Sequence, residues 1–319
     1  PARPQIFHGR ESELRDIAEG LVKGTARIAI LGSGGVGKTS LALAVMHHAE
    51  VSTVYQQLHF IPCHSASTCD DLAFSIAPHL GLEKAPNLSK VIVHHLSYHP
   101  SPVLLVLDNF ETTWEKNESR REVEEFLSLL AEVPKLSLMI TMRGSERPGK
   151  VQWSRPFFPS LAPFDDSAAL QTFHDIAGDD HDHSIIQELL QLTGNLPLAV
   201  SLMAQVVSCD GGERTLSRWS TECTRLLSDG YDQTSSLDIS ITLSYTSPRM
   251  TPGAQELLSL LAMLPDGMSD SDLVQSGIGI ANILSCKATL IQTSLAYMDH
   301  RRVLRVLPPI REHIYRKYP

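Results

Sequence analysis

The residues best suited to chemistry lie in one glycine-rich stretch, Gly32 to Ser40, which reads Gly-Ser-Gly-Gly-Val-Gly-Lys-Thr-Ser. This is the phosphate-binding pattern G-x-x-x-x-G-K-[ST]. Its glycines let backbone N–H groups turn toward an oxyanion without a Cβ in the way. We expect Lys38 to reach the β- and γ-phosphates and the hydroxyl of Thr39 to hold Mg²⁺. The predicted nucleotide ligands here are Gly34, Gly35, Val36, Gly37, Lys38, Thr39 and Ser40.

A second candidate metal ligand follows a buried strand. Val103 to Leu107 is continuously apolar, as is typical of a central parallel strand, and Asp108 comes directly after it. A carboxylate there can complete the Mg²⁺ shell opposite Thr39, so the predicted metal ligands are Thr39 and Asp108. Asn109 and Glu111 follow closely.

An arginine ends another predicted strand. Leu136 to Thr141 has a strand pattern and leads to Arg143. Open α/β sheets bind ligands at the carboxyl ends of their strands, so we expect Arg143 to face the terminal phosphate. The alternative is a solvated surface arginine.

The surrounding elements predict an α/β fold with a parallel P-loop NTPase sheet. The apolar run Arg27 to Leu31 before the glycine-rich loop predicts a strand, and Ser40 to Met46 after it predicts a helix whose dipole favours phosphate. Further expected elements are a helix from Ser12, a strand over Thr53 to Ile61, a helix opened by a Thr68/Asp71 capping box, helices over Asn87 to Tyr98 and Arg121 to Leu130, and a short fifth strand around Phe157 and Phe158.

Beyond Pro163 the pattern changes to helices alone. Asp165 or Asp166 is expected to cap the first of them, and Pro197 lies near the start of the third. The acidic and histidine-rich loop 179–183 could bind a metal, but a solvated loop is the favoured interpretation. Three helices, with Asp270 capping one, then precede a hairpin at 295–307, which is a winged-helix pattern. The predicted domains are 1–160 (nucleotide-binding), 161–228 (helical) and 229–319 (winged-helix).

Composition restricts the possible classes of protein. Hydrophobic residues make up 42% of the 319 residues, as expected of a folded, soluble protein. The net charge of −9 disfavours broad nucleic-acid or membrane-surface binding. The five cysteines are scattered and form no C-x-x-C pair, so reduced thiols in a cytoplasmic protein are expected. The first four residues resemble a linker from a longer protein rather than a signal peptide.

The motifs together resemble the NB-ARC family, the nucleotide-binding switch of signal-transducing STAND ATPases, and most closely the NB-ARC domains of fungal NOD-like receptors. The resemblance covers roughly the first 200 residues and rests on five segments. These are Phe7-His8-Gly9-Arg10-Glu11, the glycine-rich loop, residues 104–115 (Leu-Leu-Val-Leu-Asp-Asn-Phe-Glu-Thr-Thr-Trp-Glu), Ile140-Thr141-Met142-Arg143-Gly144 and Gly194-Asn195-Leu196-Pro197-Leu198.

The resemblance implies an ADP/ATP switch with Mg²⁺ in an innate-immunity or heterokaryon-incompatibility type receptor. His8 and Arg10 would line the adenine and ribose pocket, Arg143 would sense the γ-phosphate, and Pro197 would pack on the base. ADP would hold a closed state, and ATP exchange would open it for self-association. Effector and repeat-sensor domains are expected outside both ends of this segment.

Two departures from the family pattern matter. A second aspartate that would activate water is replaced by Asn109, which cannot accept a proton, so slow hydrolysis is expected unless Glu111 substitutes. The predicted catalytic set is Lys38, Asp108, Glu111 and Arg143. The family's Met-His-Asp motif is also missing, and Arg311, or His313, would contact the β-phosphate of ADP in its place.

Two other classes stay open. An AAA-type ATPase would need a catalytic acid and a trans-acting arginine that the sequence does not identify. A DNA-binding regulator would use the winged helix, since residues 300–319 hold six basic residues against one acidic residue. Residues 229–319 together hold eight basic and nine acidic residues, which disfavours DNA as a partner.

Overall fold

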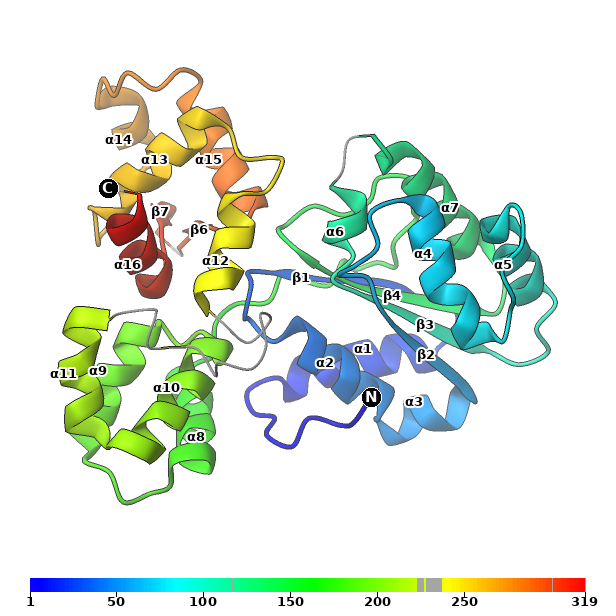
Figure 1. Cartoon of the computed structure of the whole chain (residues 1–319), viewed down its shortest axis with the longest axis horizontal. Coiled ribbons are helices and arrows are strands. Elements are labelled where there is room, and N and C mark those ends of the chain that lie inside the picture. The colour runs from blue at the N-terminus through cyan, green and yellow to red at the C-terminus, as the bar shows by residue number, and fades with distance from the viewer. Residues whose placement is uncertain (116–117, 223–226, 228–236, 300, 319) are drawn as a thin grey trace. The chain divides into compact units, whose positions relative to one another are not determined.

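The computed structural model describes residues 1–115, 118–222, 227, 237–299 and 301–318 (Figure 1). The chain forms two compact units. The sheet unit comprises Pro1–Gln5, Arg10–Leu31 and Lys38–Leu161, and the helical unit comprises Ile6–Gly9, Gly32–Gly37 and Ala162–Pro319. The predicted boundary between residues 228 and 229 lies outside the described residues, so the division into three domains stays a prediction.

The sheet unit is built on four strands in the order β1-β4-β3-β2. The strands are β1 (Arg27–Gly32), β2 (Gln57–Pro62), β3 (Val103–Asp108) and β4 (Leu136–Arg143). β2 pairs with β3, and β3 with β4, in parallel, with Pro62 opposite Asp108 and Leu107 opposite Ile140. This confirms the predicted α/β class with a parallel sheet. The carboxyl ends of β3 and β4 thereby place Asp108 and Arg143 at one edge.

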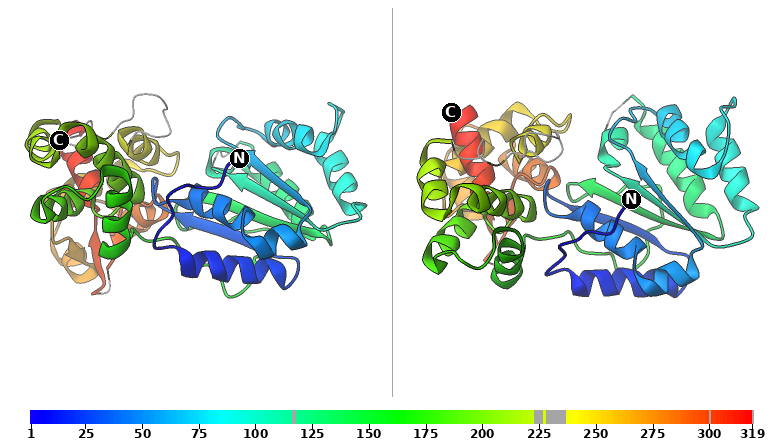
Figure 2. Two further views of the ribbon diagram at one scale, coloured as in Figure 1. Left: turned by 90° about the horizontal axis from the view of Figure 1, so that it is seen from below. Right: turned by 60° about the horizontal axis from the view of Figure 1, so that its bottom comes forward.

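Helices cover both faces of this sheet (Figures 1 and 2). On one face lie α1 (Glu11–Val22), α2 (Lys38–Met46) and α3 (Ala49–Val54). The other face carries α4 (Cys69–Ile76), α5 (Leu88–Ser97) and α7 (Arg120–Glu132), with the short helices η1 (Ala77–Leu80) and α6 (Glu111–Trp114) in the same region of the chain. The predicted capping box of α4 is present: the Asp71 N–H donates to Thr68 Oγ1, and the Thr68 N–H donates to Asp71 Oδ2.

The hydrophobic core explains why the sequence of β3 is an unbroken apolar run. All six residues of β3 are buried, since helices cover both of its faces. Phe110, Trp114 and Phe126 lie in the same hydrophobic cluster as Leu105 and Leu107. The cluster continues into the chain just after β3, which anchors the segment that carries Glu111.

Two predicted strands differ from the observed ones. The expected second strand starts at Gln57 rather than Thr53, because the residues before it form α3, where the Thr53 hydroxyl donates to the Ala49 carbonyl. No strand forms at Phe157 and Phe158. A single bridge occurs at Leu161 instead, whose N–H donates to the Leu31 carbonyl at 2.8 Å. Two adjacent aromatic residues were too weak a signal for a strand.

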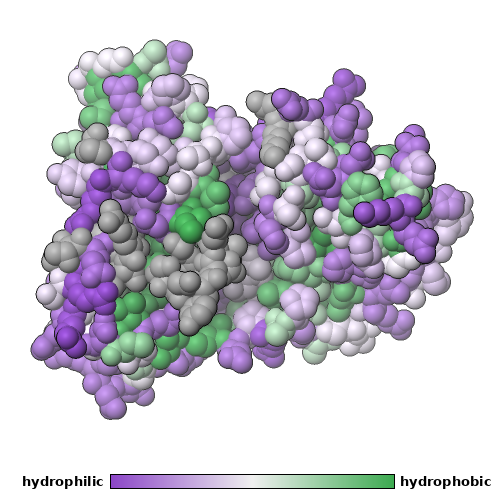
Figure 3. All heavy atoms as spheres, viewed as in Figure 1, coloured by the Kyte–Doolittle hydropathy of each residue, from purple (hydrophilic) through white to green (hydrophobic). Residues whose placement is uncertain are grey.

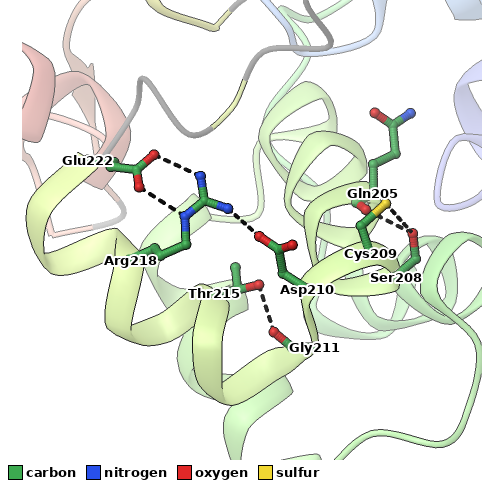
Figure 4. Close-up of polar contacts among 8 residues, drawn as sticks. All are labelled: Gln205, Ser208, Cys209, Asp210, Gly211, Thr215, Arg218 and Glu222. Atoms are coloured by element: carbon green, nitrogen blue, oxygen red, sulfur yellow. Dashed lines mark hydrogen bonds and ion pairs between the residues drawn. The ribbon is translucent and has the colours of Figure 1, made fainter.

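Within the described residues, four helices form the first part of the helical unit; the sequence predicts the first three, and the fourth is an addition. They are α8 (Asp166–Ala177), α9 (His183–Thr193), α10 (Pro197–Asp210) and α11 (Gly212–Glu222). Asp165 caps α8 by accepting the Ala168 N–H, and Asp182 caps α9 in the same way. At the corner between α10 and α11, Arg218 bonds both oxygens of Glu222 and also pairs with Asp210 (Figure 4). This corner fixes how α11 folds back.

The remainder of the helical unit combines helices with a small antiparallel sheet of order β5-β7-β6. Its elements are α12 (Leu237–Tyr245), α13 (Pro252–Ala262), β5 (Met268–Ser269), α14 (Asp270–Gln275), α15 (Ile283–Gln292), β6 (Tyr297–Met298), β7 (Val303–Arg305) and α16 (Pro308–Lys317). The expected hairpin is confirmed, with Met298 opposite Leu304. The cap of α14 is Ser269 rather than Asp270, because its hydroxyl accepts the Asp272 N–H. The winged-helix assignment stays a prediction.

Hydrophilic side chains predominate on the face shown in Figure 3, with apolar residues in smaller groups between them. Within the described residues, no helix has the length and apolar character needed to cross a membrane.

Candidate functional site

Lys38 is the first residue of α2 and is buried, with 6% of its surface exposed. Burial lowers the pKa of its ammonium group to about 8, and the nearby Arg143 acts in the same direction while Glu111 and Asp108 oppose it. An anion bound beside this ammonium group would stabilise its charged form. The position therefore fits the predicted phosphate contact.

Asp108 is held by two hydroxyl groups. Oδ1 accepts the Thr39 hydroxyl at 2.8 Å and the Thr141 hydroxyl at 2.6 Å. Burial raises the pKa of Asp108, while the two hydroxyl bonds and Lys38 lower it. The predicted metal ligands Thr39 and Asp108 are therefore direct neighbours.

The chemistry of this pair fits Mg²⁺, which takes oxygen ligands in an octahedral shell. Among the residues that the structure describes, no group of three His, Cys, Asp or Glu side chains could hold a metal. A cation at Thr39 and Asp108 would therefore complete its shell with phosphate and water oxygens, as P-loop proteins do.

Asn109 reverses the chain directly after Asp108. Its φ is +56°, a left-handed conformation that asparagine tolerates better than most residues. The Asn109 N–H donates to the Thr141 hydroxyl at 3.0 Å, and the Phe110 N–H donates to the Thr141 carbonyl at 3.0 Å. Thr141 thus holds both the carboxylate and the turn that follows it.

Glu111 and Arg143, both predicted catalytic residues, bind each other. Glu111 Oε1 lies 3.2 Å from Arg143 Nε, and Oε2 accepts the Arg143 backbone N–H at 3.2 Å. Both residues are shielded, since 10% of the Glu111 side chain and 20% of the Arg143 side chain are exposed. Arg143 is therefore not the solvated surface arginine of the alternative interpretation.

The glycines of the phosphate-binding loop belong to the helical unit. Gly35 has φ +76°, and a Cβ there would lie 2.9 Å from the Cβ of Leu198. The Gly35 carbonyl accepts the Leu198 N–H at 3.0 Å. Glycine is therefore required at position 35 both for its backbone conformation and for the close approach of α10.

The residues expected at the adenine and ribose divide between the units. His8 belongs to the helical unit, where its Nε2 lies 2.7 Å from Asp175 Oδ2 of α8. Gly9 packs against Ala168, since a Cβ at Gly9 would lie 2.4 Å from the Ala168 Cβ. Arg10 belongs to the sheet unit and pairs with Glu13 at 3.0 Å.

Pro197 is buried as the first residue of α10, and Arg311 is half-buried in α16. His313 is buried and its Nδ1 lies 2.7 Å from Asp238 Oδ1, so it joins α16 to α12. Whether Arg311 or His313 contacts a phosphate stays a prediction. In the loop 179–183, Asp182 caps α9 and Asp179 pairs with His174 at 3.1 Å.

Sequence reasoning missed Thr141. It was treated as the end of a strand, although its place two residues before Arg143 and beside the Asp108 strand was a usable signal. It also missed the pairing of Glu111 with Arg143, which depends on the left-handed turn at Asn109.

The chain is similar to known proteins in part of its sequence and in its fold. Residues 1–151, somewhat less than half of the chain, match the family model described as novel STAND NTPase 1. No curated protein sequence matches the chain.

Solved structures share the fold over nearly the whole length. The Walker-type ATPase PABY2304 of Pyrococcus abyssi superposes with a TM-score of 0.67 at 16% identity, covering 99% of each chain. The ORC2 protein of Aeropyrum pernix gives 0.57 at 14% identity, covering 98% of this chain and 94% of that chain. Cdc6p of Pyrobaculum aerophilum gives 0.55 at 14% identity, covering 100% and 97%. The fold is therefore that of P-loop NTPases.

Proposed function

We propose that the chain is the nucleotide-binding part of a STAND-type switch that binds ADP or ATP with Mg²⁺. The observation that carries the proposal is that a complete phosphate-binding loop ends in the buried Lys38 and in Thr39, whose hydroxyl donates to the buried carboxylate of Asp108. The match of residues 1–151 to a STAND NTPase model supports it.

In this proposal, backbone N–H groups of Gly34 to Gly37 and the ammonium of Lys38 bind the β- and γ-phosphates. Thr39 and Asp108 hold Mg²⁺, which neutralises phosphate charge when it is bound. Ser40 adds a hydroxyl beside the phosphates, and Arg143 responds to the γ-phosphate.

Hydrolysis is proposed to be slow. Asn109 has no carboxylate to accept a proton from water. Glu111 has one, but both of its oxygens contact Arg143, so a water molecule would have to compete with Arg143 for the carboxylate. A slow reaction suits a switch, because each nucleotide state persists long enough to be read.

Switching would depend on residues outside the phosphate site. His8, Arg10, Pro197 and Arg311 are proposed to contact the nucleotide in the ADP state, so that exchange for ATP changes the arrangement of the domains. Self-association in the ATP state, a role in innate immunity or heterokaryon incompatibility, and a cytoplasmic location are part of the same proposal. Effector and sensor domains would belong to a longer protein.

The basic hairpin favours DNA binding as a second candidate function. Arg301 and Arg302 are exposed, while Arg305 pairs with Asp299. One solved structure of similar fold, ORC1 of Aeropyrum pernix at TM-score 0.53, is described in complex with DNA. Duplex binding that weakens steeply with added salt, and is lost in Arg301→Ala/Arg302→Ala, would support this second function.

The first experiment is to denature the purified protein and identify any released nucleotide by chromatography, with ATP hydrolysis followed on the same preparation. Stoichiometric ADP with negligible turnover is expected. Lys38→Met should purify without nucleotide, because it keeps the stem of the side chain and removes its charge. If the wild-type protein neither retains nucleotide nor binds added nucleotide, the proposal is overturned. Brisk turnover would favour the AAA-type ATPase.

A further inference from the structure

Glu111 holds Arg143 from two directions. One carboxylate oxygen lies 3.2 Å from the guanidinium Nε, and the other accepts the backbone N–H of the same residue at 3.2 Å. A carboxylate that clasps an arginine in this way fixes the direction of the side chain as well as its charge. The arginine expected to respond to the γ-phosphate therefore already has an anionic partner.

The main chain at Glu111 is firmly anchored. Phe110 is fully buried, and the Trp114 indole N–H donates to Glu124 at 2.7 Å. The Thr113 hydroxyl donates to the Ala66 carbonyl at 3.0 Å. Since α6 is tied down on both sides of Glu111, its carboxylate can leave Arg143 by side-chain rotation while the backbone stays in place.

The charges around the pair are nearly balanced. Lys38 and Arg143 supply two cations, and Asp108 and Glu111 supply two carboxylates. Leaving a shielded arginine without an anionic partner is strongly destabilising. A γ-phosphate is a stronger partner than a carboxylate, whereas ADP offers no group at that position.

Resting on the proposed function, we propose that Glu111 sets the preference between ADP and ATP by competing with the γ-phosphate for Arg143. With ADP the Glu111–Arg143 pair stays intact. With ATP the γ-phosphate must displace Glu111, so part of its binding free energy is used to break the pair. Glu111 thereby lowers affinity for ATP relative to ADP, a role distinct from that of a catalytic base.

The test is to measure the affinities of nucleotide-stripped protein for Mg-ADP and Mg-ATPγS by calorimetry. Glu111→Gln should raise the ratio of ATPγS to ADP affinity about tenfold, in the usual range of coupling between two ligands. Arg143→Gln should lower that ratio, because the γ-phosphate loses its partner. If the wild-type protein binds neither nucleotide, the proposed function itself is refuted, and the competition with it.

Two controls separate competition from simple charge removal. Glu111→Asp keeps the negative charge but is one methylene shorter, so it cannot reach both groups of Arg143; it should raise the ratio as Glu111→Gln does. In the Arg143→Gln background, Glu111→Gln should leave the ratio unchanged. A ratio unaffected by either Glu111 variant, or shifted equally without Arg143, would overturn the inference, even if hydrolysis were slowed.

Discussion

The hydroxyl of Thr141 donates a 2.6 Å hydrogen bond to Oδ1 of Asp108, the predicted metal-binding carboxylate. The same hydroxyl accepts the Asn109 N–H, so one fully buried side chain on β4 orients both the end of β3 and the turn after it. The position of the candidate metal ligand is thus determined by a neighbouring strand as well as by its own.

Thr141→Val should weaken Mg²⁺-dependent nucleotide binding. Valine has nearly the same shape but cannot donate, so Asp108 loses a bond that lowers its pKa, and protons compete with Mg²⁺ at higher pH. We expect about a tenfold loss of Mg²⁺ affinity, larger at pH 5.5 than at pH 8, in titrations with bound ADP. Thr141→Ser keeps the hydroxyl and should restore the affinity; equal losses in both variants would contradict this role.

Nucleotide binding at pH 8 should be accompanied by proton uptake. Burial lowers the pKa of Lys38 to about 8, so about half of these groups are neutral at that pH before binding. Phosphate favours the charged form and raises the pKa again, so uptake should approach about half a proton per nucleotide. Calorimetry in buffers of different ionisation enthalpy measures it. Uptake should fall from pH 8 to pH 7, where Lys38 is already charged; no uptake at pH 8 would argue against this environment.

Asn109→Asp should accelerate ATP hydrolysis. Aspartate tolerates the left-handed backbone at this position and supplies the carboxylate that asparagine lacks. We expect a gain of about ten- to a hundredfold in single-turnover hydrolysis. Asn109→Gly accepts the same backbone without a carboxylate and is the matched control. Equal acceleration in both variants would indicate that flexibility, and not a base, limits the reaction.

Gly194→Ala should destabilise the protein more than Gly81→Ala. Both glycines end helices in a left-handed conformation, φ +57° and +68°, so both substitutions carry the same backbone cost of about 1–2 kcal/mol. A Cβ at Gly194 would also lie 2.8 Å from Cδ of Pro308, whereas nothing lies within 4 Å at Gly81. We expect an additional cost of about 1–3 kcal/mol in urea unfolding.

Pro308→Ala provides the check on that contact. It removes the ring atom that the new methyl group would meet, so the double variant should recover part of the loss. Additive losses in the double variant would mean that the turn at Gly194 and the start of α16 are energetically independent.

Local sequence signals predicted the sheet and its edge well. The unbroken apolar run of β3 and the capping residues Thr68 and Asp165 depend on neighbours in the chain, so their roles could be predicted from spacing. The phosphate-binding loop was equally clear, because few other structures need glycines and a lysine at those intervals.

Contacts between distant residues were beyond that reasoning. The pairing of Glu111 with Arg143 joins residues from two strand ends, and the tie of His313 to Asp238 joins α16 to α12. Each depends on side-chain directions that are fixed after the chain is folded. The helical conformation of Thr53, at the end of α3, was missed for a related reason, since β-branched residues favour a strand unless packing overrides them.

The assignment of Ile6–Gly9 and Gly32–Gly37 to the helical unit has a practical consequence for dissecting the protein. The backbone passes from one unit to the other at several points, so no single cut releases either one whole. A fragment starting at Ala162 would lack the partners of Ala168 and Leu198, namely Gly9 and Gly35, and would expose the surfaces that they cover. Truncation at residue 161 is therefore expected to yield a poorly folded fragment, and each unit is better studied within the whole chain.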